Sequence, residues 1–250
     1  MKGATILPTA HLDLSANDTY HLCLAHLMLL KDTYRSFFTQ MALKPNRHVI
    51  MDNGVVENGQ PMGDDLLLLL SRDTHITEMI LPDLIFDSAS TLRMSESAIK
   101  VCQDREIDVS LMAVPQGRNR KEWRSCCREM LQWPVRSIGI SKFVLEYYES
   151  RSEALEDIPE LIQSKKEIHI LGCPGHPREI AKIDEKFEHR IRGVDSAIAL
   201  AYTQGGLYGG LHPERPDVTL DLEDGSSLDR RLLERNRAWW IHTCRTTFYD

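Results

Sequence analysis

Acidic and amide side chains follow several short apolar runs in this chain of 250 residues. Asp52, Asp87 and Asp195 stand at or just after such runs, and Gln116 follows another. One carboxylate can attack an anomeric carbon to form a covalent glycosyl intermediate, while a second acid moves protons on the leaving and entering groups. A third acid and a glutamine amide can grip the edge of a purine-like base. The residue types therefore predict chemistry at a glycosidic bond, provided that the fold brings them to one place.

Two other uses of these carboxylates stay open. An aspartate at the end of a strand is often the N-cap of the next helix. Three aspartates without histidine partners would also suit Mg²⁺ rather than Zn²⁺, so a Mg²⁺-dependent hydrolase is an alternative. His169, on a predicted strand, and His176, in a Pro-Gly-His-Pro turn, are more typical of structural residues than of ligands. We expect no metal site.

The elements that must position these residues alternate along the chain. Short runs rich in Ile, Val and Leu predict strands, and longer segments with helical spacing separate them. The predicted strands are Ala4–Leu7, His48–Asp52, Glu78–Leu81, Asp108–Val114, Ser137–Ile140, Glu167–Leu171, Ile191–Val194 and, more weakly, Val218–Leu222. The predicted helices include Asp18–Lys31, Gly63–Arg72, Thr91–Asp104, Arg120–Gln132, Leu155–Ser164 and Pro177–His189.

Strands that alternate with helices predict a parallel sheet. About eight such units fit a single-domain (β/α)₈ TIM barrel over residues 1–250, with residues 228–248 as a closing C-terminal helix. A doubly wound open sheet is the alternative, but no G-x-G-x-x-G sequence follows the first predicted strand. Because the chemistry of such barrels lies at the carboxyl ends of the strands, the polar residues that follow the apolar runs are the candidates for the site.

Composition and charge exclude several classes of protein. The net charge of −7 argues against a general electrostatic DNA coat, although local basic patches remain compatible with it. The six cysteines form no C-x-x-C pair and no zinc-finger spacing, so we expect them to be reduced and mostly buried. The N-terminal residues lack the apolar core of a signal peptide, and the longest apolar run, Leu66–Leu70, is too short to cross a bilayer. We expect a cytoplasmic protein without a membrane partner.

An ordered set of motifs resembles a known family. The segments MDNGVVENG, LPDLIFDSAS, VPQG, SIGIS, HILGCPGHPREI and RGVDSAIA together are similar to the tRNA-guanine transglycosylase superfamily, from about residue 51 to residue 196. The chain departs from the family pattern at Val55, Glu57 and Ile140, where the family has glycine, glutamine and glycine, and it lacks the C-x-C-x-x-C zinc signature. The short, zinc-free form looks most like the DpdA-like branch, which inserts 7-deazaguanines into phage or bacterial DNA.

The resemblance implies a base exchange in which a 7-deazaguanine such as preQ₀ replaces guanine, with neither a redox cofactor nor ATP. By this likeness Asp195 would be the nucleophile that attacks C1′, and Asp52 the acid that assists proton transfer. Asp87 would hold the N1 and exocyclic-amine edge of the base, and Gln116 would face O6. The other base-binding positions implied are Asn53, Gly54, Gly139 and Ile140. The implied partners are DNA or tRNA and a second copy in a homodimer, in the host cytoplasm if the chain is phage-encoded.

A basic cluster follows Gln116 and is the candidate for phosphate contacts. It consists of Arg118, Arg120, Lys121 and Arg124. Phosphate pairing would supply affinity without sequence information, and a duplex target would need its guanine flipped out. A solvated helix face explains the same charges. Exchange on tRNA and a catalytically inactive nucleic-acid-binding barrel also stay open as functions.

Overall fold

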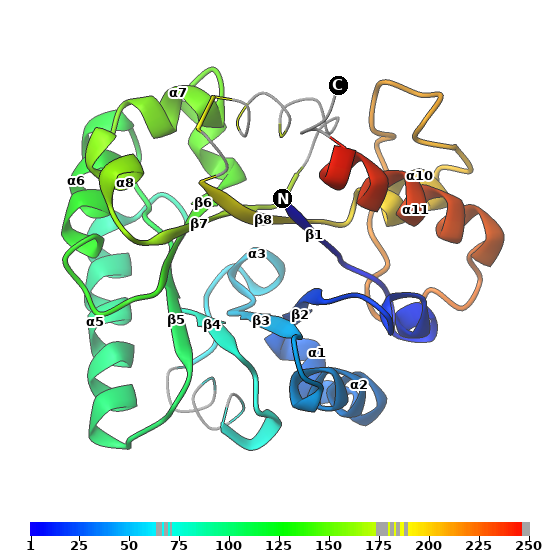
Figure 1. Cartoon of the computed structure of the whole chain (residues 1–250), viewed down its shortest axis with the longest axis horizontal. Helices are drawn as coiled ribbons and strands as arrows, with labels where there is room; N and C mark the ends of the chain where they lie inside the picture. The colour runs from blue at the N-terminus through cyan, green and yellow to red at the C-terminus, as the bar shows by residue number, and fades with distance from the viewer. Residues whose placement is uncertain are drawn as a thin grey trace.

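Parallel strands form a sheet that curls into a nearly closed barrel (Figure 1). The computed structural model describes residues 1–63, 67, 70, 72–173, 180, 183, 186–187 and 190–246. Within this part of the chain the sheet has eight strands in the order β1-β8-β7-β6-β5-β4-β3-β2. The strands are β1 (Lys2–Thr5), β2 (Tyr20–Leu24), β3 (His48–Asp52), β4 (Glu78–Ile80), β5 (Ser110–Ala113), β6 (Ser137–Ser141), β7 (Glu167–Leu171) and β8 (Ile191–Ser196). The predicted (β/α)₈ fold is confirmed.

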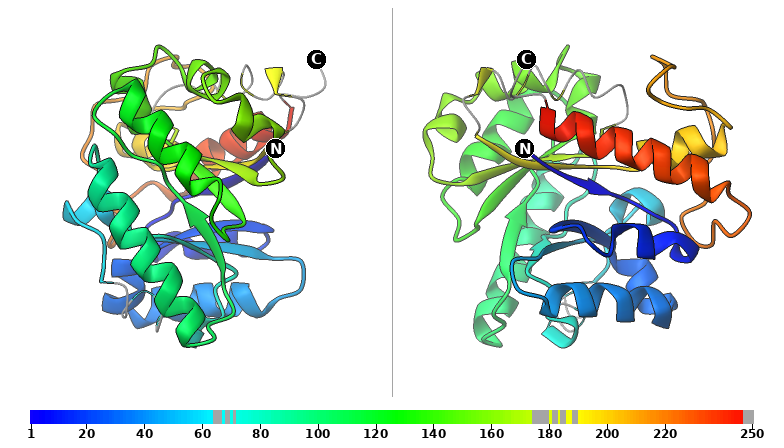
Figure 2. Two further views of the ribbon diagram at one scale, coloured as in Figure 1. Left: turned by 90° about the vertical axis from the view of Figure 1, so that its left-hand side faces the viewer. Right: turned by 45° about the vertical axis from the view of Figure 1, so that its right-hand side comes forward.

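Helices follow most strands and cover the outside of the sheet (Figures 1 and 2). The helices described are α1 (Ala25–Leu30), α2 (Asp32–Leu43), α3 (Val55–Asn58), α5 (Ser88–Asp104), α6 (Arg120–Met130), α7 (Arg151–Glu156), α8 (Pro159–Gln163), α10 (Ile198–Gln204) and α11 (Arg230–Thr246), with two 3-10 helices at Thr9–Ser15 and Lys142–Glu146. The helices α5, α6 and α11 match predictions. The predicted helix at residues 155–164 is instead the pair α7 and α8, and the predictions at 63–72 and 177–189 lie largely outside the described residues.

One predicted strand is wrong, and the strand that replaces it lies elsewhere. Seven of the eight predicted strands are present, two with the predicted bounds and five with shifted ends, but Val218–Leu222 has no regular structure. The missing strand is β2, at the start of the segment predicted as a helix over Asp18–Lys31. All five residues of β2 are buried, so the run shows no polar alternation, and α1 follows it directly in the same apolar stretch.

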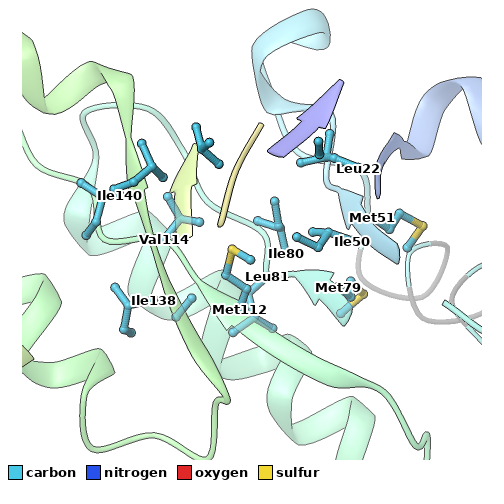
Figure 3. Close-up of a cluster of buried hydrophobic side chains, with 14 of the residues drawn as sticks. Leu22, Ile50, Met51, Met79, Ile80, Leu81, Met112, Val114, Ile138 and Ile140 are labelled. Carbon is cyan, nitrogen blue, oxygen red and sulfur yellow. The ribbon is translucent and has the colours of Figure 1, made fainter. Parts of the chain in front are cut away.

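The barrel interior is filled by side chains and is not a pore. Aliphatic and methionine side chains from neighbouring strands meet at its centre, among them Leu22, Ile50, Ile80 and Met112 (Figure 3). All six cysteines are free and buried, as predicted. Such packing makes the interior rigid and leaves open space at the ends of the strands.

The last helix closes the barrel beside its first strand. α11 runs along β1 and α10 (Figure 2). The Trp240 indole is fully buried and donates to the carbonyl oxygen of Ala4 in β1 at 3.3 Å. Asn236, also buried, donates to Thr203 of α10 and accepts from the Gly209 amide. No helix among the described residues is long and apolar enough to span a membrane.

Candidate active site

A cavity of about 190 Å³ opens at the carboxyl ends of the strands. Its polar wall consists of residues that end or follow successive strands. They are Asp52, Asp83, Gln116, Ser141, Gly172 and Asp195. Leu220 and Leu222, in the loop that was predicted as a strand, form part of the apolar wall. The structure therefore brings Asp52, Gln116 and Asp195 together at one mouth of the barrel, as predicted.

Asp195 is held by a buried histidine and by a backbone amide. One of its oxygens, Oδ1, contacts Nε2 of the fully buried His169 at 3.1 Å. The backbone N–H of Gly172 donates to both oxygens, at 3.1 and 3.2 Å. Gly172 has a φ of +64°, in the region that favours glycine, and its turn aims the N–H at the carboxylate. Hydrogen bonds to a charged carboxylate stabilise it and fix its orientation.

The turn that carries Gly172 is itself held in place by the side chain of Arg151. Nη1 of the fully buried Arg151 donates to the carbonyl oxygens of Leu171 and Gly172, at 3.1 and 2.7 Å. The guanidinium therefore supplies a donor to two backbone acceptors at the end of β7. The amide that faces Asp195 is thus part of a fixed turn.

Asp83 and Gln116 form a hydrogen-bonded pair in the cavity wall. The Gln116 amide donates to one Asp83 oxygen at 2.6 Å, and Asn53 donates to the other at 2.6 Å. Burial raises the pKa of Asp83 to about 6 in spite of these two hydrogen bonds. The pair presents oxygens that accept and an amide that donates, which is the pattern needed for the edge of a purine-like base.

Asp52 lies among the other acidic side chains of the cavity. Burial raises its pKa well above the ordinary range, and the charges of Glu57, Asp83 and Asp195 raise it further. Asp52 therefore holds a proton more readily than an exposed aspartic acid does. Two carboxyl groups in one cavity, one a proton donor and the other a hydrogen-bonded acceptor, are the arrangement used for acid-assisted displacement.

Asp87 does not belong to the cavity wall, so its predicted place is wrong. Its side chain accepts from the Ser90 amide at 3.0 Å and caps α5. This hydrogen bond lowers the pKa of Asp87, as is usual for an exposed N-cap. The acid that meets Gln116 is Asp83, four residues earlier and directly after β4. The capping role weighed in the sequence analysis is therefore correct for Asp87.

The other predicted base-binding residues lie behind the wall or beside it. Asn53 is fully buried and supports Asp83, while its own oxygen accepts from the Val55 amide at 3.0 Å. Gly54 has a φ of +78° and starts the turn into α3. Gly139 and Ile140 lie inside β6, paired with β7, and among the described residues the wall is formed instead by Ser141, the next along the strand. His176 lies outside the described residues.

The basic cluster after Gln116 is largely neutralised by acids on neighbouring helices. Arg120 pairs with Glu153 at 2.6 Å and packs over the ring of Tyr148, and Arg124 pairs with Asp157 at 3.4 Å. Its remaining members, Arg118 and Lys121, are exposed. Two of the four residues are therefore already paired with carboxylates, and the phosphate contacts of the cluster stay a prediction. Two cations, Lys142 and Arg215, do line the cavity itself.

Sequence reasoning missed the residues that support the site from inside the barrel. His169 was interpreted as structural, Arg192 was considered only among the arginines that could grip the nucleic acid, and Tyr20 and Glu78 were given no role. Their signal was a polar residue within an otherwise apolar strand, such as the histidine of EIHIL or the arginine of IRGVD. Buried polar residues of this kind are costly unless they are paired, so each implies a partner. Among the described residues, no group of three or more His, Cys, Asp and Glu side chains is arranged to hold a metal ion.

Comparisons with known proteins support the barrel fold and give no information on the reaction. No protein-family model matches the chain, and no curated protein does. The carboxyl transferase domain of Rhizobium etli pyruvate carboxylase, in a structure with pyruvate, is similar with a TM-score of 0.56 and 12% identity over 96% of this chain and 47% of that chain. The 2,3-dimethylmalate lyase of the PEP mutase/isocitrate lyase superfamily has a TM-score of 0.50 and 10% identity, covering 95% of this chain and 89% of its own. The chain spans about half the length of the carboxyl transferase structures, and at these identities the likeness shows a shared barrel fold alone.

Proposed function

We propose that the protein is a transglycosylase that exchanges guanine in DNA for a 7-deazaguanine such as preQ₀. The observation that carries the proposal is the pairing of carboxyl groups in the cavity. Asp195 is held by His169 and the Gly172 amide, while burial and acidic neighbours raise the pKa of Asp52. A nucleophile and an acid in one cavity of nucleobase size are what displacement at an anomeric carbon requires.

The proposed reaction has two displacements. An oxygen of Asp195 forms a bond to C1′ while the C1′–N9 bond breaks, and the leaving guanine takes its proton from Asp52. The incoming base then gives its N9 proton to the Asp52 carboxylate and attacks C1′, which releases Asp195. The second displacement returns the proton to Asp52 and the bonding electron pair to Asp195, so the two steps together balance without a cofactor.

Asp83 and Gln116 are proposed to bind the base edge in both steps. Each oxygen of Asp83 has one lone pair left after accepting from Asn53 and Gln116, and these lone pairs can accept from N1–H and the exocyclic amine. The Gln116 amide can turn from Asp83 to O6 of the base. The resemblance in sequence had assigned this role to Asp87, and the position of Asp83 makes it the better candidate.

The choice of DNA rests on sequence and not on the geometry of the cavity. The chain lacks the zinc signature of the tRNA-acting members of the family that it resembles, and this favours the DNA-modifying branch. Exchange on tRNA is the alternative. Lys142 and Arg215 at the cavity can pair with the phosphates that flank the reacting nucleotide in either polymer.

The test is incorporation of radiolabelled guanine into DNA and, in parallel, into tRNA. We expect incorporation into DNA, complete loss in Asp195→Asn, and retention in Asp87→Asn, the matched control, because asparagine also caps a helix. Incorporation into tRNA alone would move the proposal to the RNA branch. Full exchange by Asp195→Asn, or binding of both nucleic acids without any base release, would contradict it.

A further inference from the structure

A chain of buried polar side chains runs behind Asp195 into the barrel. His169 of β7 contacts Asp195 through Nε2, and its other ring nitrogen, Nδ1, lies 2.8 Å from the hydroxyl of Tyr20 in β2. Nε of Arg192 in β8 donates to the same hydroxyl at 3.0 Å. Tyr20 and His169 are buried, so water does not compete for these contacts. The chain of contacts joins β2 to the consecutive strands β7 and β8, which come much later in the sequence.

The direction of each hydrogen bond follows from the chemistry of its ends. A guanidinium can only donate, so the Tyr20 oxygen accepts from Arg192. The hydroxyl proton of Tyr20 is then directed to Nδ1 of His169, which must carry a lone pair. The ring proton of His169 therefore sits on Nε2 and is donated to Asp195. One fixed cation thus determines the tautomer of the histidine and the donor that faces the carboxylate.

The electrostatics of the interior agree with this assignment. Burial raises the pKa of the Tyr20 hydroxyl, so Tyr20 keeps its proton. Burial also lowers the pKa of His169, so the ring is neutral and carries a single proton. A neutral ring with one proton can donate at only one nitrogen, which makes the tautomer decisive.

The backbone of β8 is adapted to bring Arg192 to Tyr20. The pairing of β7 with β8 slips by one residue between Ile168 and His169, and Arg192 is the extra residue of this bulge. A bulge re-aims a side chain, and here the guanidinium is turned toward Glu78 and Glu167, which hold it. Gly193, next in the strand, leaves room for Tyr20, because a Cβ there would lie 2.6 Å from the tyrosine ring.

We propose that Tyr20 and His169 form a hydrogen-bond relay, set by Arg192, that holds the Asp195 carboxylate in one orientation for attack on C1′. Both are positioning residues, since neither lines the cavity among the described residues. The inference rests on the proposed function for its role in catalysis. The relay itself concerns only the direction of the hydrogen bonds, so it can be tested separately.

The first test removes single atoms from the relay. Tyr20→Phe keeps the ring and deletes the hydroxyl, and we expect kcat to fall about tenfold or more while KM stays within about twofold, because only the orientation of the nucleophile is lost. Tyr148→Phe is the matched control. It deletes a buried hydroxyl that donates to Asp157 at 2.7 Å, away from the cavity, and should leave both constants unchanged. A loss of kcat in Tyr20→Phe no larger than in the control would overturn the proposal.

Substitution of His169 tests whether one donor at the Nε2 position is enough. His169→Gln places an amide N–H near that position, whereas His169→Leu offers no donor. We expect the glutamine variant to retain about tenfold more activity than the leucine variant. Equal activities, with both proteins folded by circular dichroism, would contradict the relay. If the leucine variant does not fold, the glutamine variant is compared with Tyr20→Phe, which it should exceed.

A spectroscopic test needs no substrate. Nitrogen-15 NMR distinguishes a protonated ring nitrogen from one with a lone pair, and the His169 signals are identified by their loss in His169→Gln. We expect the Nε2–H tautomer in the wild type, and a changed Nδ1 signal in Tyr20→Phe because the Nδ1 lone pair loses the hydroxyl that donates to it. A wild type without base exchange but with this response would refute the proposed function and leave the relay standing. An Nδ1–H tautomer in the wild type would refute the relay.

Discussion

The substitution Glu78→Gln tests the energetics of the buried charges below the active site. Glu78 is completely buried and contacts the Arg192 guanidinium, Nε2 of His48 at 3.0 Å and the Ser137 hydroxyl at 2.6 Å. Burial alone would raise its pKa, but the hydrogen bonds from His48 and Arg192 outweigh burial and hold the pKa at about 2. Glutamine removes the negative charge and turns one acceptor into a donor that faces Arg192.

The size of the effect follows from the shift in pKa. A fall from the ordinary value of 4.5 to about 2 corresponds to about 3 kcal/mol of stability. Because the folded-state pKa is the lower one, this contribution is fully present above pH 4.5 and is lost as the pH falls through 2. Breaking a buried ion pair costs about 3–5 kcal/mol, and Glu167 remains as a partner of Arg192, so we expect the lower end of that range.

Urea unfolding of wild type and Glu78→Gln at several pH values measures this contribution. We expect a loss of about 3 kcal/mol at pH 7 that shrinks as the pH approaches 2, because the wild-type carboxylate is then protonated as well. The difference between the two proteins cancels the titration of groups that do not interact with Glu78. Glu160→Gln, an exposed partner of Arg128, is the control and should show no measurable loss. A pH-independent difference, or one below about 1 kcal/mol at pH 7, would refute the reasoning.

Further predictions concern the support and the chemistry of the cavity. Gly193→Ala should lower the free energy of unfolding in urea by about 1–3 kcal/mol, since the new Cβ meets the Tyr20 ring; an unchanged midpoint would contradict this contact. Arg151→Met leaves two buried carbonyl oxygens without a donor and should cost about 2 kcal/mol in thermal unfolding, whereas an unchanged Tm would show that water replaces the guanidinium. The affinity for a 7-deazaguanine, measured by calorimetry, should weaken as the pH falls below about 6, because Asp83 becomes protonated there. The Asp83→Asn variant should bind the base weakly at every pH. An affinity of Asp83→Asn that still depended on pH in this range would refute the assignment. Asp52→Asn should slow base exchange about 100-fold or more and leave base affinity nearly unchanged, and undiminished steady-state exchange would remove Asp52 as the acid.

The strands that the sequence predicts are those whose apolar runs end clearly at polar residues. The first residues of β2 fail this rule, because YHLCL is buried throughout and continues into the apolar α1. The spacing of the combined run is helical, and only the need to complete the barrel makes its first half a strand. The alternation of apolar and polar residues in VTLDL, residues 218–222, led to the wrong strand prediction for a related reason. Leu220 and Leu222 face the cavity from an irregular loop, so the period of two reflects burial on one side without a sheet.

The candidate site is predictable where a residue ends a strand and less so where it follows one. Asp52 and Asp195 lie within β3 and β8, and their side chains reach the cavity as expected. Asp83 and Asp87 both follow β4, and sequence alone does not show which of them turns inward. The choice is made by Asn53 and Gln116, whose amides meet Asp83 from two other strands.

The interior relay lies beyond sequence reasoning because it depends on register. A slip of one residue between β7 and β8 places Arg192 beside Tyr20, and no local pattern announces such a bulge. The polar residues of β2, β7 and β8 are visible in the sequence as exceptions to apolar strands. Their pairing becomes clear only when the barrel closes and brings the three strands together.

The most direct test of the account is to locate the covalent intermediate. The protein is incubated with a guanine-containing oligonucleotide, denatured before the incoming base is added, digested, and analysed by peptide mass spectrometry. We predict an adduct on the peptide that contains Asp195, absent in Asp195→Asn and released when a 7-deazaguanine is supplied before denaturation. An adduct on Asp83 or Asp52, or base exchange that proceeds with no adduct at all, would contradict the central claim.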